Sequence, residues 1–170
     1  MDILIACYSR TGNNALLARF LADKIKADLE EIKGVRDRSQ DSAVFRIVID
    51  SLFGLKERIH KPKKKLSNYD LVIICTPAWI GRLPSPLRTY LALTRGSFKK
   101  YAIASLSGKG NNPKLIKQVR NLLGRKEVAS LELKVPVKEG EDVVKKKVSL
   151  HELKMFEKEI NEFVKKLKIS

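Results

Sequence analysis

The sequence is poor in cysteine and histidine, with two of each in 170 residues. Two cysteines are too few for a disulfide framework, and no group of histidines, cysteines and carboxylates has the spacing of a metal site. Cys7 and Cys75 lie in apolar, strand-like segments, which favours two buried free thiols. His60 and His151 stand among charged residues, and no nucleophile–base pair accompanies them. We therefore predict no metal and no catalytic residue.

Long hydrophobic runs are also missing. The chain has no apolar run of about 18 residues and no N-terminal signal pattern. We therefore expect a soluble, cytoplasmic protein without an integral membrane segment. Its 170 residues predict a single domain over residues 1–170, long enough to bury a substantial core.

Acidic residues are the third deficit. The chain has 35 Lys and Arg but only 19 Asp and Glu, which gives a net charge of +16. The excess is spread along the chain and is not a detachable tail. Such a field favours anionic ligands or partners. A lysine-rich solvated surface, as in thermophilic proteins, explains it better than nucleic-acid binding, because the sequence has no paired Cys/His finger and no aromatic-rich RNA-binding strand. We predict no nucleic-acid partner.

What the chain does contain is an alternation of strand-like and helix-like segments. Apolar or alternating runs predict strands over 3–7, 28–32, 71–75, 101–106 and 128–137. Apolar positions with helical spacing predict helices over 15–27, 43–58, 85–91, 113–123 and 149–168. This alternation requires a parallel sheet covered on both faces. We predict an α/β fold of three layers, doubly wound, with a five-stranded parallel sheet in the order 2-1-3-4-5.

The predicted helix over 43–58 precedes a basic cluster of Lys61, Lys63, Lys64 and Lys65. A basic amphipathic helix lying on a membrane surface is one interpretation. Packing of the apolar face on the domain or on a second subunit is favoured, because the basic cluster follows the helix and Pro62 within it indicates a linker.

Three polar or glycine-rich loops, at 9–14, 76–81 and 107–112, follow predicted strands. In doubly wound sheets, ligands bind at the carboxyl edge beside the point where strand order reverses. The first loop leads into a helix, whose unpaired N–H groups and positive dipole end suit a phosphate. Hydroxyls, amides, a glycine and one positive charge complete this candidate anion site: Ser9, Arg10, Thr11, Gly12, Asn13 and Asn14.

These loops resemble those of the flavodoxin family over nearly the whole chain. Ser9-Arg10-Thr11-Gly12-Asn13 resembles the family's phosphate loop, and Tyr69-Asp70-Leu71-Val72-Ile73-Ile74 its third strand. Residues 76–84 resemble the T-P-x-W-x-G-x-x-P loop of flavodoxin-like proteins and related FMN-dependent quinone reductases.

The resemblance implies one bound FMN. Residues 9–14 would hold its phosphate, 76–81 would pass along its ring and 107–111 would border its other edge. For Trp79, stacking on the ring is favoured over ordinary packing. Beyond residues 9–14, the predicted cofactor-binding residues are Thr76, Pro77, Ala78, Trp79, Ile80, Gly81, Ser107, Gly108, Lys109 and Gly110.

The chain departs from the family pattern in three places. Asn14 stands where the family usually has Thr, and Cys75 where Gly is common. The loop at 107–112 has no aromatic residue. A ring stacked on one side only would leave its other face open to a substrate or another subunit.

Three functions remain open. The first is an oxidoreductase that passes electrons from NAD(P)H through FMN to a quinone or similar acceptor, which the basic surface and the open ring face favour. The second is an electron carrier to a redox protein, although carriers of this family are typically acidic. The third is a cofactor-free binding module, for which Asn14 is the only hint. Cys7 and Cys75 could also form a redox-active pair. This is disfavoured, because disulfides between neighbouring strands tend to be strained.

Overall fold

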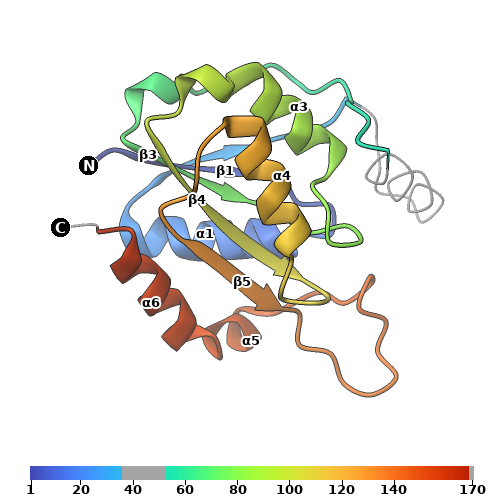
Figure 1. Ribbon diagram of the computed structural model, residues 1–170. Helices are drawn as coiled ribbons and strands as arrows, with labels where there is room; N and C mark the ends of the chain where they lie inside the picture. Colours follow the sequence, from blue (N-terminus) through green and yellow to red (C-terminus); the bar gives the residue numbers. More distant parts are fainter. Residues whose placement is uncertain (36–52, 169–170) are drawn as a thin grey trace.

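The computed structural model describes residues 1–35 and 53–168 of the chain. Its centre is one five-stranded, all-parallel sheet in the order β2-β1-β3-β4-β5, as predicted (Figure 1). The strands are β1 (Ile3–Cys7), β2 (Asp28–Glu31), β3 (Leu71–Cys75), β4 (Lys100–Ser107) and β5 (Ser130–Lys134).

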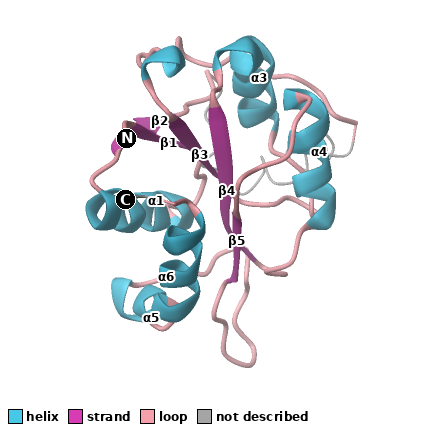
Figure 2. Cartoon of the chain, turned by 60° about the vertical axis from the view of Figure 1, so that its left-hand side comes forward, coloured by secondary structure: helices cyan, strands magenta, loops and turns pink. Residues whose placement is uncertain are grey.

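Helices cover both faces of the sheet. Figure 2 shows α1 (Asn13–Ile25), α5 (Leu150–Lys154) and α6 (Glu157–Lys166) on one side, and α3 (Ser85–Thr94) and α4 (Pro113–Leu123) on the other. Two short 3₁₀ turns, η1 (Leu66–Asn68) and η2 (Arg95–Ser97), precede β3 and β4. The predicted three-layer, doubly wound α/β fold is confirmed.

The apolar strand sequences explain this arrangement. Side chains alternate across a strand, so β1 sends Ile5 and Cys7 into the core under α1, and Leu4 and Ala6 into the core under α3. All five residues of β1 and all five of β3 are buried. Strands apolar on both sides require a covering layer on each face, which the helices provide.

Two predicted elements differ in extent from those in the structure. The strand predicted over 128–137 is shorter, because β5 covers only Ser130–Lys134. Single backbone bonds to β4 continue on either side of it, from the Val128 N–H to Tyr101 O at 2.8 Å and from the Val135 N–H to Ser107 O at 2.9 Å, and β4 itself ends at Ser107. The helix predicted over 149–168 is two helices. Between them the Phe156 N–H bonds to Leu153 O at 3.1 Å, a tighter i→i−3 turn that breaks the regular ladder.

The helix predicted over 43–58 lies outside the described residues as far as residue 52. Its last part is not helical. Gly54 has a φ of +67°, which a right-handed helix does not allow. Further along, Ile59 forms an antiparallel bridge with Gly34, so this segment pairs as extended chain.

Candidate functional site

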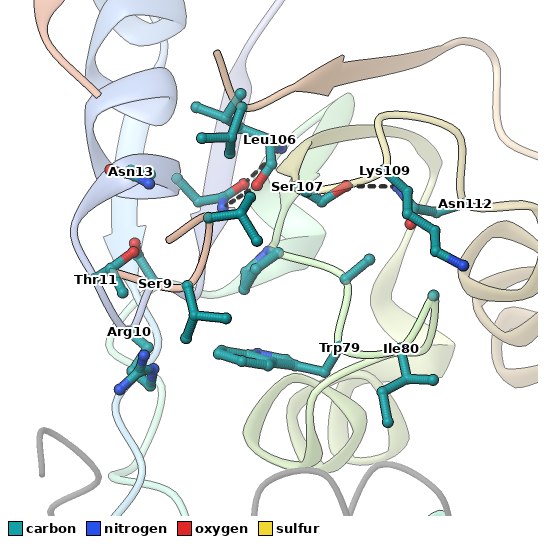
Figure 3. A pocket seen from close by; sticks show the side chains of 18 residues that line it. Ser9, Arg10, Thr11, Asn13, Trp79, Ile80, Leu106, Ser107, Lys109 and Asn112 are labelled. Carbon is teal, nitrogen blue, oxygen red and sulfur yellow. Dashed lines mark hydrogen bonds between the residues drawn. The ribbon is translucent and has the colours of Figure 1, made fainter. Parts of the chain in front are cut away.

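The three polar loops meet at the carboxyl edge of the sheet, around a cavity of about 280 Å³ (Figure 3). The cavity lies beside the switch point between β1 and β3, where strand order reverses. The predicted residues that line it are Ser9, Arg10, Thr11, Asn13, Asn14, Pro77, Ala78, Trp79, Ile80, Gly81, Ser107, Gly108 and Lys109. The sequence prediction therefore identified most of this wall.

Gly12, Thr76 and Gly110 were predicted as site residues but lie beside the cavity. Gly12 is exposed, with a φ of +94°, and turns the chain into α1. Thr76 is fully buried and donates its hydroxyl to Pro77 O at 3.0 Å. Gly110, with a φ of +75°, packs so closely on Lys134 that a Cβ would lie 3.0 Å from that residue's Cβ. These three shape the loops around the cavity.

The N-terminus of α1 offers hydrogen-bond donors at the cavity. No side chain of the described residues caps this end, so the N–H groups of the first turn have no side-chain acceptor. The Ser9 hydroxyl oxygen accepts the Gly12 N–H at 3.2 Å. Nothing lies within 4 Å of the position a Gly12 Cβ would take, so an anion can approach the backbone there.

The side-chain amides of Asn13 and Asn14 were predicted to donate to a phosphate. In the structure both amides bond to backbone groups of the chain instead. The Asn14 amide donates to Leu106 O at 2.9 Å and accepts the Leu106 N–H at 3.0 Å. The Asn13 amide donates to Lys146 O at 2.8 Å and accepts the Val148 N–H at 2.9 Å. Each buried amide thus holds a backbone segment on both its donor and its acceptor side.

Trp79 is held by a tight two-residue turn. Its N–H and C=O pair with those of Arg82 at 3.0 and 2.9 Å, while Ile80 and Gly81 take φ values of +50° and +70°. Two consecutive positive φ values are the mark of a type I′ turn. A β-branched residue is strained there, and Ile80 is also 52% exposed. Strain of this kind clusters at functional sites.

Arg10 and Trp79 come together from different loops (Figure 3). The Arg10 guanidinium carbon lies 5.3 Å from the centroid of the Trp79 ring, a cation–π contact. Within the described part of the chain, Arg10 Nε and Trp79 Nε1 are buried without a hydrogen-bond partner. Two N–H donors are thus held at this cavity, and they fit a ligand with several acceptor atoms.

The charge of the cavity is positive. Arg10 and Lys109 line it, and no acidic side chain of the described residues does. Lys109 and Arg10 sit at opposite ends of the labelled wall in Figure 3. An anionic ligand is therefore favoured over a cationic one.

Cys7 and Cys75 lie in register on adjacent strands, as the prediction of two strand-borne thiols requires. Both are buried and free, and both thiols donate to Asn14 O, at 3.4 and 3.3 Å. Burial raises the pKa of the Cys75 thiol well above its usual value. The thiol therefore stays protonated, which makes it a poor nucleophile.

The sequence also predicts no catalytic histidine, no metal site and no membrane-spanning segment. His60 and His151 are exposed and do not line it. Residues 1–35 and 53–168 contain no group of three or more His, Cys, Asp or Glu side chains arranged to hold a metal ion. Among those residues, no helix is both long and apolar enough to span a bilayer.

Sequence reasoning missed five lining residues. They are Leu106, Asn112, Val135, Val143 and Val144. Val143 and Val144 come from the loop between β5 and α5, which the long-range bonds of Asn13 draw to the cavity. No local pattern in the sequence indicates those bonds, whereas Asn112 closes the predicted 107–112 loop and was within reach of the prediction.

Solved structures share this fold. A flavoprotein from Lactobacillus acidophilus NCFM, in complex with FMN, has a TM-score of 0.67 and 23% identity, covering 76% of this chain and 91% of its own. A flavodoxin from Fusobacterium nucleatum bound to flavin mononucleotide has a TM-score of 0.53 and 12% identity, covering 98% of this chain and 96% of its own.

A third relative in structure is oxidised flavodoxin 1 from Bacillus cereus, with a TM-score of 0.53 and 15% identity, covering 97% of this chain and 98% of its own. No family model matches the sequence, and a search of curated proteins finds no match. At these identities the likeness shows a shared, flavodoxin-like fold.

Proposed function

We propose that this protein binds one FMN in the cavity at the carboxyl edge of the sheet and acts as a redox flavoprotein. The observation that carries the proposal is the meeting of two features in one cavity. An uncapped helix N-terminus with hydroxyls beside it suits a phosphate, and an indole ring suits a flat aromatic ring. FMN is bound in two of the solved structures that share the fold, which supports the choice of ligand.

In this proposal the phosphate is held by the first-turn N–H groups of α1, the hydroxyls of Ser9 and Thr11, and Arg10. Hydrogen bonds to charged groups contribute roughly 1.5–3 kcal/mol each. An aromatic contact adds only about 0.5–1.5 kcal/mol beyond the area that it buries. The phosphate contacts therefore dominate affinity, and Trp79 mainly orients the ring.

A bound FMN supplies both hydride transfer and single-electron transfer, while the protein binds, orients and tunes it. The missing nucleophile–base pair is therefore compatible with an enzyme. We infer an oxidoreductase that accepts hydride from NADH or NADPH and reduces a quinone or a similar acceptor. Lys109 at the cavity and the net charge of +16 support this proposal, because nicotinamide cofactors are anionic.

A second candidate is an electron carrier. Val143 and Val144 add an apolar wall to the cavity, so it is more closed than the lack of an aromatic residue in the 107–112 loop indicates. A covered flavin favours electron transfer through an exposed edge over contact with a hydride donor. Given the net charge of +16, the redox partner of such a carrier would be acidic.

The test begins with a titration of the purified protein with FMN. A flavin spectrum shifted on binding, at one FMN per chain, is expected. Without binding, both redox functions are wrong and the cofactor-free module takes their place.

Anaerobic mixing with NADH and then NADPH distinguishes the two redox functions. Rapid bleaching of the flavin, followed by reoxidation with a quinone, identifies the oxidoreductase. No bleaching by either nucleotide, with reduction in two separate one-electron steps during a dithionite titration, identifies the carrier.

A further inference from the structure

The loop between β5 and α5 reaches the cavity at one place and is fastened at another. Val143 and Val144 line the cavity, and Lys146 and Val148 are held by the side chain of Asn13. The Asn13 bonds, of 2.8 Å to Lys146 O and 2.9 Å from the Val148 N–H, span 133 and 135 positions in the sequence. They connect the start of α1 directly to this loop.

The loop has its own internal supports. The Lys146 ammonium lies 3.3 Å from a Glu141 carboxylate oxygen and 2.9 Å from a Glu152 oxygen. The Val144 N–H donates to Asp142 Oδ1 at 2.8 Å. These contacts fix the backbone that presents the two valines.

Gly108 lets the loop close against the opposite wall. A Cβ on Gly108 would lie 3.1 Å from Val143 Cγ2, which is closer than ordinary contact. Val143 therefore packs directly on the backbone of the 107–112 loop. Val143 can take this position because residue 108 has no side chain.

We propose that Asn13 is a positioning residue that fastens residues 138–148 across the cavity, so that Val143 and Val144 form a second apolar wall for the bound flavin. This inference rests on the proposed FMN function. It also assigns Asn13 a role other than phosphate ligand. An amide turned toward a phosphate would leave the Val148 N–H and the Lys146 carbonyl without their partner, and Val148 is only 8% exposed.

The first arm of the test needs no cofactor. Amide hydrogen exchange is measured on the FMN-free protein for the wild type, Asn13→Ala and Asn121→Ala. Asn121 is exposed on α4, away from the cavity, and gives a matched loss of one amide. Loss of two hydrogen bonds is expected to speed exchange at 143–148 about tenfold in Asn13→Ala. The Asn121→Ala protein should match the wild type.

The second arm measures FMN dissociation by dilution. Asn13→Ala and the double variant Val143→Ser/Val144→Ser should both release FMN about tenfold faster than the wild type, since both remove the wall. Only Asn13→Ala should also show faster exchange at Val148.

Two results would overturn the inference. Unchanged exchange at 143–148 in a folded Asn13→Ala protein would mean that Asn13 does not hold the loop. Faster FMN release in Asn13→Ala but not in the valine variant would mean that Asn13 contacts the phosphate itself. If the wild type binds no FMN, the proposed function fails, and the exchange arm alone decides whether Asn13 fastens the loop.

Discussion

Asn14 has a structural role that explains why it can stand where flavodoxins usually have threonine. Its amide has both a donor and an acceptor, which match the C=O and N–H of Leu106 on β4. A threonine hydroxyl also donates and accepts, but it does so from a single atom on a shorter side chain, whereas the asparagine amide has its donor and its acceptor on two separate atoms. The asparagine at this position therefore ties α1 to β4 beneath the cavity, and its presence does not argue against the proposed phosphate site.

Asn14→Ala is expected to lower the free energy of unfolding by about 2–3 kcal/mol, because it leaves the buried Leu106 N–H and C=O unpaired. Urea denaturation followed by circular dichroism measures the change. Asn121→Ala, at an exposed position, should stay within about 0.5 kcal/mol of the wild type. Equal midpoints for wild type and Asn14→Ala would show that the Leu106 bonds contribute nothing.

The Thr11 hydroxyl is expected to contact the phosphate of FMN. Thr11→Ala should weaken FMN binding about tenfold or more, because a hydrogen bond to a charged group is lost. Isothermal titration calorimetry gives the dissociation constant. Thr94→Ala removes a hydroxyl that donates to Tyr90 O on α3 and should leave the affinity unchanged. Equal losses in both variants would point to a general loss of stability.

The start of α5 shows how a very short helix is held. The Ser149 hydroxyl accepts the Glu152 N–H at 3.2 Å, and the Glu152 carboxylate accepts the Ser149 N–H at 2.8 Å, which forms a capping box. This Ser149 N–H, and then Lys146, lower the pKa of Glu152 to about 2. The Glu152 carboxylate thus belongs both to the capping box of α5 and to the ion pair with Lys146 in the loop beside the cavity.

Titration of Glu152 by carbon-detected NMR should give a pKa of about 2. Because the folded pKa lies below the ordinary 4.5, the contribution of Glu152 to stability is complete above about 4.5 and is lost as the pH falls toward 2. Lys146→Ala should move the pKa up toward its ordinary value. A wild-type pKa near 4.5 would contradict the capping box.

The strands and their following loops were predictable because each depends on a local pattern. The apolar runs Ile3–Cys7 and Leu71–Cys75 predict buried parallel strands, and the loops after them must then share one edge of the sheet. The course of residues 135–149 was not predictable. It depends on Asn13, more than 130 positions away, and on the pairing of Val143 with Gly108.

The net charge of +16 acts over the entire protein surface. If the protein takes hydride from NADPH, raising the salt concentration from about 0.05 to 0.5 M should lower kcat/KM for NADPH several-fold through screening. Stopped-flow reduction at several salt concentrations measures this. The reaction of the reduced protein with a neutral quinone serves as the control and should change little. A rate for NADPH that is independent of salt would contradict electrostatic attraction.

In the proposed complex the flavin lies against Trp79 and its phosphate is bound at residues 9–14. Trp79 is the single tryptophan of the chain, so its fluorescence reports on this cavity alone. Titration of the wild type with FMN and, in parallel, with riboflavin, which lacks the phosphate, tests both contacts at once. We expect FMN to quench the fluorescence with one site per chain, and riboflavin to require a concentration at least about a hundredfold higher, since several charge-assisted bonds are missing. No quenching by FMN would contradict a flavin beside Trp79, and equal affinities for the two flavins would contradict a phosphate site at residues 9–14.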